Sequence, residues 1–129
     1  MLRRRKTDPL ARNTLLAIAA GRVVLGTGAL VATRPALRAL GFREADPANQ
    51  AMAKLTGGRD LALGLLGLLA RDNPEALRAT GAVAAGVDAS DSITMGFSAR
   101  RGEIGAAGFI GALTGAAAAA AGCWAANRL

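Results

Sequence analysis

The segment IGAAGFIGALTGAAAAAAGCWAA, residues 104–126, decides the fold. Its 23 residues include no charged side chain. About twenty apolar residues are enough for a helix to cross the roughly 30 Å hydrocarbon core of a membrane. A helix on the surface of a soluble protein needs a polar face, which this segment lacks. The segment therefore predicts a transmembrane helix.

Three further apolar segments extend this pattern along the chain. The second of them is the least apolar, because Lys54, Arg59 and Asp60 lie in its first half. Together with the last segment they predict an all-α, polytopic membrane protein, in which one domain over residues 1–129 forms a single bundle of four transmembrane helices. A soluble four-helix bundle remains the alternative. The predicted spans are residues 14–33, 51–70, 77–97 and 104–126.

Short polar runs separate the four segments. Arg34-Pro35 is expected to end the first helix, because the residue before a proline disfavours helical geometry. The runs RDNP at 71–74 and SARRG at 98–102 are expected to be the next two turns.

Basic residues flank the apolar segments. The chain has 16 Lys and Arg against 9 Asp and Glu, and five of the basic residues lie in the segment 1–13. Proteins that bind nucleic acid gather such residues on a folded face, so the expected partner is the lipid bilayer and not nucleic acid. Loops rich in Lys and Arg stay in the cytoplasm. The sequence therefore predicts a multi-pass protein of the cell membrane with both termini in the cytoplasm.

The residues that usually hold metals are scarce. The chain has no histidine and one cysteine, Cys123, which excludes an intrachain disulfide and a Cys/His zinc site. The Asp88-x-x-Asp91 spacing also occurs in magnesium–diphosphate sites, but such sites need further carboxylates. We expect neither a metal nor a cofactor.

Glycines recur at helical spacing in three of the segments. Small residues let the backbones of two membrane helices approach closely, and Gly111 and Gly115 form a GxxxG pair. The stripe on the last segment serves either packing within the chain or a homo-oligomer interface, and the sequence leaves both open. The glycines concerned are Gly105, Gly108, Gly111, Gly115 and Gly122 in the last segment, Gly57, Gly64 and Gly67 in the second, and Gly21 and Gly28 in the first.

Five ionisable residues lie inside predicted spans: Arg22, Arg59, Asp60, Asp88 and Asp91. A charge at the centre of a membrane helix costs roughly 2.5–3.5 kcal/mol on insertion scales, so these side chains should face inward and pair. At 1.5 Å per residue, Arg22 lies at the depth of Asp88, and Arg59 at that of Asp91. We therefore expect these two ion pairs, with Asp60 left over.

A charged cluster inside a membrane is a functional site by default. Three carboxyl groups against two guanidinium groups predict that one Asp keeps its proton, and the candidates for a catalytic acid are Asp88 and Asp91. We favour a non-enzymatic role, in which the cluster binds a small lipophilic or ionisable ligand or organises a partner. The alternatives are an isomerase or cyclase acting on a lipid-soluble substrate, a proton-coupled carrier, and a purely structural network.

One motif carries a resemblance. The run Gly58-Arg59-Asp60-Leu61-Ala62-Leu63-Gly64, followed by Val87-Asp88-Ala89-Ser90-Asp91, resembles a family of short four-helix membrane proteins of unknown function in actinobacteria and some fungi. The chain is more loosely similar to DoxX-like membrane proteins, some of which are accessory subunits of redox systems. Neither resemblance implies a catalytic residue. The high content of Ala, Gly and Arg fits a GC-rich bacterium.

Overall fold

The computed structural model describes residues 8–39 and 46–129, and within these ranges the protein is all-α. Four long helices form two antiparallel hairpins, in which α1 packs mainly against α3 and α4 packs mainly against α5. The elements are α1 (Pro9–Val31), α2 (Thr33–Ala39), α3 (Pro47–Leu69), the 3-10 turn η1 (Ala70–Asp72), α4 (Pro74–Arg100) and α5 (Ala106–Arg128).

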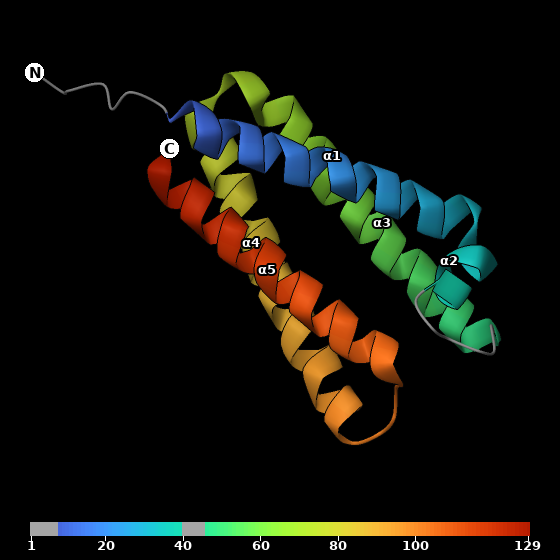
Figure 1. Cartoon of the computed structure of the whole chain (residues 1–129). Coiled ribbons are helices and arrows are strands. Elements are labelled where there is room, and N and C mark those ends of the chain that lie inside the picture. The colour runs from blue at the N-terminus through green and yellow to red at the C-terminus, as the bar shows by residue number, and fades with distance from the viewer. Residues whose placement is uncertain (1–7, 40–45) are drawn as a thin grey trace, which may run out of the picture.

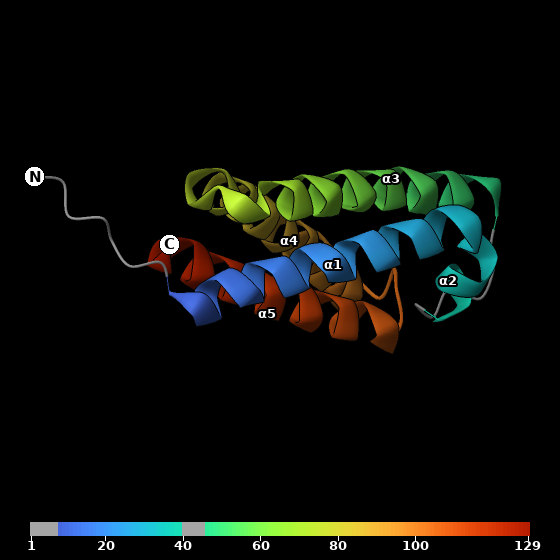
Figure 2. The ribbon, with the colours of Figure 1, turned by 90° about the horizontal axis from the view of Figure 1, so that it is seen from above.

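The two hairpins meet at one end of the molecule and diverge at the other (Figure 1). The end where they meet holds η1, the start of α1 and the end of α5, and there Asp8 Oδ2 lies 3.8 Å from Arg128 Nη1. The opposite end holds α2 and the loop between α4 and α5. Seen from above, α3 and α5 lie on opposite sides of the molecule (Figure 2). The described chain thus has its first and last helical residues at the same end.

Three of the long helices begin with the same N-cap arrangement. Asp8, Asp46 and Asn73 each precede a proline, and each side chain accepts at least one hydrogen bond from a backbone N–H group of the first turn. Such a residue satisfies donors that have no partner within the helix, and the following proline has the backbone angle that the helix needs. The helices therefore start three to five residues before the predicted spans 14–33, 51–70 and 77–97.

The first helix ends earlier than predicted. Its last residue is Val31, and Ala32 leaves helical geometry at φ −122° and ψ 49°. A proline inside a helix clashes with the carbonyl group four residues before it, which for Pro35 is that of Val31. The break therefore lies on the N-terminal side of Pro35, and Thr33 begins α2 instead of ending the first span. The turn predicted at 98–102 also moves, because α4 continues to Arg100.

Glycines bring α1 and α3 into close contact. A Cβ atom on Gly26 would lie 2.5 Å from the backbone nitrogen of Leu61, and one on Gly64 would lie 2.6 Å from the carbonyl oxygen of Ala19. No atom of the neighbouring helices lies within 4 Å of where Gly21 or Gly28 would carry a Cβ. The prediction that Gly21 and Gly28 pack in the first helix was therefore wrong, and Gly26 occupies the contact face.

Burial in the bundle is the reverse of that in a soluble protein. The buried residues of α4 and α5 are mostly alanines, while many of their large apolar side chains are exposed. Among the residues that the structure describes, Leu77 is the most fully buried large side chain. Examples are the buried Ala84, Ala85, Ala99, Ala119 and Ala125 and the exposed Ile93, Phe97, Ile110 and Leu113.

Two helices of the described chain are long and apolar enough to cross a membrane: Pro9–Val31 and Gly108–Arg128. These correspond to the first and last predicted spans. α3 and α4 do not meet the same criterion, and both carry charged residues of the cluster.

Candidate functional site

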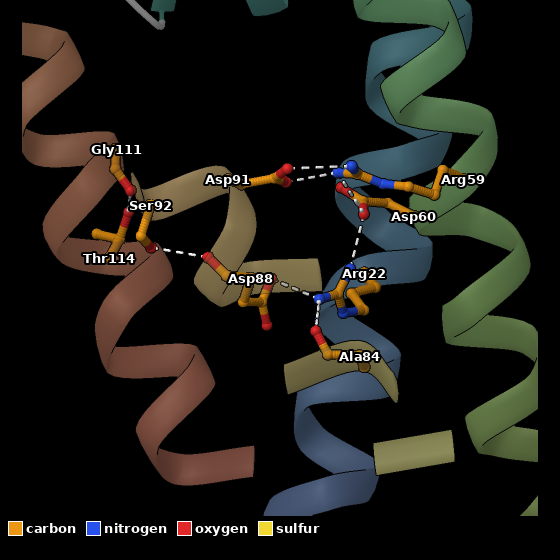
Figure 3. A network of polar contacts seen from close by, with 9 residues as sticks. All are labelled: Arg22, Arg59, Asp60, Ala84, Asp88, Asp91, Ser92, Gly111 and Thr114. Atoms are coloured by element: carbon orange, nitrogen blue, oxygen red, sulfur yellow. Dashed lines mark hydrogen bonds and ion pairs between the residues drawn. The ribbon is translucent and has the colours of Figure 1, made fainter. Parts of the chain in front are cut away.

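The five ionisable residues of the predicted spans lie together between the two hairpins (Figure 3). We call this set the charged network: Arg22 of α1, Arg59 and Asp60 of α3, and Asp88 and Asp91 of α4. Both predicted ion pairs are present. Arg22 Nη2 lies 2.5 Å from Asp88 Oδ1, and Arg59 Nη2 lies 2.6 Å from Asp91 Oδ2.

Arg22 is the centre of the network. Its guanidinium group donates to Asp60 Oδ1 over 2.7 Å, to Asp88 Oδ1, and to the carbonyl oxygen of Ala84 over 3.1 Å. One side chain of α1 therefore connects α3 with α4. The side chain of Arg22 is only 8% exposed, so these bonds replace the water that the charge has lost.

Arg59 forms the other half of the network. Nη1 and Nη2 of Arg59 donate to the two carboxylate oxygens of Asp91 over 3.2 and 2.6 Å. This is the forked arrangement that makes arginine–carboxylate pairs strong and directional. Nη2 also lies 3.5 Å from Asp60 Oδ1.

The expectation that Asp60 is left over was wrong. Asp60 Oδ1 accepts from both arginines, so it joins the two predicted pairs into one network. Asp60 lies on the same helix face as Gly57 and Gly64. Those glycines form the contact with α1, and this same face brings Asp60 to Arg22.

Burial changes from one end of the network to the other. The side chain of Asp88 is 16% exposed beside Arg22, whereas that of Asp91 is 41% exposed beside Arg59. The network therefore has a closed end at Arg22 and an open end at Arg59 and Asp91.

Four polar groups of the network have no hydrogen-bonding partner in the described part of the chain. The Nε–H groups of Arg22 and Arg59 are buried without an acceptor in the described part of the chain. The Oδ2 atoms of Asp60 and Asp88 accept no hydrogen bond from residues 8–39 and 46–129. Two arginines against three aspartates also leave a formal charge of −1 if all five are ionised. The network can thus take up further polar groups or a proton.

A small cavity adjoins the closed end. Arg22 and Asp88 line it together with apolar residues of all four long helices, among them Leu15, Leu63, Leu77 and Ala118. Its volume is about 20 Å³, enough for about one water molecule.

The glycines predicted for helix packing lie in different surroundings. Gly115 faces Ser92 of α4, whose Oγ would be 2.5 Å from an added Cβ, and Gly111 faces Met95. Gly108 instead faces Ile104 of the preceding loop, and Gly105 lies before α5 as its N-cap. Gly111 and Gly115 therefore pack within the chain.

No group of three or more Asp, Glu, Cys or His side chains arranged to hold a metal ion is found among the residues that the structure describes. Cys123 is exposed and unbonded on α5.

Residues 19–125 match the family described as Domain of unknown function (DUF4267). The chain belongs to the DUF4267 family. The matched region runs from α1 to α5 and includes all of the charged network. No curated protein and no solved structure matches the chain. Membership in DUF4267 supports the resemblance to a family of unknown function, while the DoxX-like resemblance stays a prediction.

Proposed function

We propose that this DUF4267 protein is a four-span protein of the cell membrane whose charged network binds a lipophilic or ionisable small ligand. The ligand's polar group would meet Arg59 and Asp91 at the open end of the network, and its apolar part would remain in the bilayer. Holding a partner protein, including a second copy of the chain, is the other role open to the same end.

The reversed burial pattern supports the membrane location. Lipid surrounds a membrane bundle with apolar material, so large side chains are stable on its outside, while small residues let its helices approach closely. α3 has 23 residues and α4 has 27, which correspond to helices of about 34 and 40 Å. Both lengths exceed the roughly 30 Å hydrocarbon core.

The charges of α3 and α4 fit this location because they are paired. Arg59, Asp60, Asp88 and Asp91 all take part in the network. Paired charges that face the inside of a bundle are the usual form in which ionisable residues occur in membranes. Four of the charges that make these two helices polar are therefore paired within the fold. Lys54 of α3 is exposed and lies outside the network.

The observation that carries the ligand proposal is the open end of the network. The Arg59–Asp91 pair is more than a third exposed, and Arg59 Nε has no acceptor in the described residues. Lipid chains offer no hydrogen bonds, so an ion pair exposed to them loses solvation without compensation. A polar group of a bound molecule would replace this lost solvation with hydrogen bonds to Arg59 and Asp91.

The enzyme and carrier alternatives have less support. An isomerase or cyclase needs a pocket of about 300 Å³ or more beside its acid, and the cavity beside Asp88 has about 20 Å³. A carrier needs a polar path, and Thr80 is the polar side chain that lines this cavity besides Arg22 and Asp88. Binding at the open end requires neither feature.

We expect the protein to retain a small lipophilic molecule when it is extracted from its membrane in mild detergent. Arg59→Gln or Asp91→Asn should reduce the retained fraction roughly tenfold or more, because a hydrogen bond to a charged group contributes about 1.5–3 kcal/mol. Native mass spectrometry measures the retained mass and also counts the copies of the chain.

Arg101→Gln is the matched control, since Arg101 is an exposed arginine of the α4–α5 loop outside the network. It should retain the molecule as the wild type does. Equal retention by the control and by Arg59→Gln, or no retained molecule in the wild type, would contradict ligand binding. A dimer that Arg59→Gln dissociates would instead assign the open end to a second copy.

A further inference from the structure

The closed end of the network has a donor and an acceptor that nothing in the described chain satisfies. Arg22 Nε–H is buried without a partner, and the residue is 7% exposed as a whole. Asp88 uses Oδ1 for Arg22, while its second oxygen points away from Arg22 (Figure 3). Both residues line the cavity of about 20 Å³.

We propose that this cavity is a binding site for one hydroxyl group, supplied either by water or by a lipid-soluble alcohol. The size of the cavity limits the bound polar group to about one heavy atom. A water needs two or more polar partners to occupy such a space, and Arg22 and Asp88 can supply them.

The chemistry of the two partners selects the hydroxyl group. Arg22 Nε–H needs an acceptor, and Asp88 Oδ2 needs a donor when the carboxyl group is ionised by its pairing with Arg22. A hydroxyl group is both, whereas an ammonium group only donates and a carboxylate or a ketone only accepts. An ammonium group would leave Arg22 Nε–H, which is buried, without an acceptor. A carboxylate or a ketone would leave Asp88 Oδ2 without a donor.

The surroundings of the site leave both sources of the hydroxyl group open. The cavity has room for water as the helices stand, and water reaches it without any ligand. The remaining lining is almost entirely apolar and includes Ile18, Leu63 and Ala118, so it would also surround the alkyl part of an alcohol if the hairpins moved apart. The alcohol source rests on the proposed function, and the water source does not.

The test uses the full-length chain purified in detergent and a matched set of six-carbon probes: 1-hexanol, hexylamine, hexanoate and 2-hexanone at equal mole fraction in the micelle. We expect 1-hexanol to give the highest midpoint of thermal unfolding of the four. Ala118→Leu adds three carbon atoms to a cavity with room for about one heavy atom, so it should close the cavity and remove the difference between the probes. Ala117→Leu adds the same side chain on the exposed side of α5 and should preserve it.

A high-resolution crystal structure of the protein without added alcohol completes the test. An ordered water within hydrogen-bonding distance of both Arg22 Nε and Asp88 Oδ2 supports the proposal. If the four probes then give equal unfolding midpoints, the site binds water alone. A preference for 1-hexanol that Ala118→Leu removes supports the alcohol source. The proposal would be overturned if the cavity is empty and 1-hexanol gives no higher midpoint than the other probes. It would also be overturned if hexylamine, hexanoate or 2-hexanone gives the highest midpoint. Retention of a ligand that depends on Arg59 is measured separately, so the proposed function can stand if this site fails.

Discussion

Replacing Arg22 with alanine should lower the free energy of unfolding in detergent by roughly 3–5 kcal/mol, the usual cost of removing one partner of a buried ion pair. The substitution leaves Asp88 without its charged partner and takes one of the two arginines from Asp60. It also removes the side chain through which α1 contacts the backbone of α4 at Ala84. A thermal or denaturant unfolding curve in detergent measures the loss.

A double-mutant cycle separates pairing from other losses. Asp88→Ala should also destabilise the protein, because Arg22 then has one carboxylate fewer. Combining it with Arg22→Ala should cost less than the sum of the two single changes by about 0.5–3 kcal/mol. Arg78→Ala is the control, since Arg78 is exposed on the same helix as Asp88. Additive losses would show that Arg22 and Asp88 do not interact.

Placing a methyl group at the contact between α1 and α3 should also destabilise the protein strongly. Gly26→Ala and Gly64→Ala would each bring a Cβ atom to within 2.6 Å of backbone atoms of the facing helix. Backbone atoms cannot rotate away as a side chain does, so the two helices must separate. Overpacking of this kind typically costs about 1–3 kcal/mol.

Gly28→Ala is the matched control on the same helix, because no atom of a neighbouring helix lies within 4 Å of its added Cβ. Alanine favours a helix over glycine by about 1 kcal/mol, so this variant should melt at the same temperature as the wild type or higher. A Gly26→Ala variant as stable as Gly28→Ala would show that the two helices are not in close contact.

The two ion pairs could be predicted from sequence because depth in a membrane helix follows directly from residue number. That reasoning places Arg22 opposite Asp88 and Arg59 opposite Asp91, as the structure has them. It does not give the face on which a neighbouring helix packs, and for this reason the role of Asp60 was missed. Asp60 shares a helix face with Gly57 and Gly64, and these glycines form the contact with α1. That shared face is readable in the sequence and could have placed Asp60 beside Arg22.

Helix boundaries were predicted less well than helix content. Apolar content shows where lipid can surround a helix, but a helix starts where its backbone donors are capped. Asp8-Pro9, Asp46-Pro47 and Asn73-Pro74 are readable in the sequence and mark these starts. The cavity could not be predicted, because it depends on how the two hairpins diverge.

We propose that α3 and α4 cross the membrane together with α1 and α5. Single cysteines at Asp72 and at Glu103 test it in a Cys123→Ser background, since these exposed residues lie just before the start and beyond the end of α4. A membrane-impermeant maleimide applied to intact and to permeabilised cells reports the side on which each cysteine lies. Four spans place the two cysteines on opposite sides, with Asp72 on the side of Leu129. If both cysteines react from the same side, α4 does not cross the membrane and the four-span account is wrong.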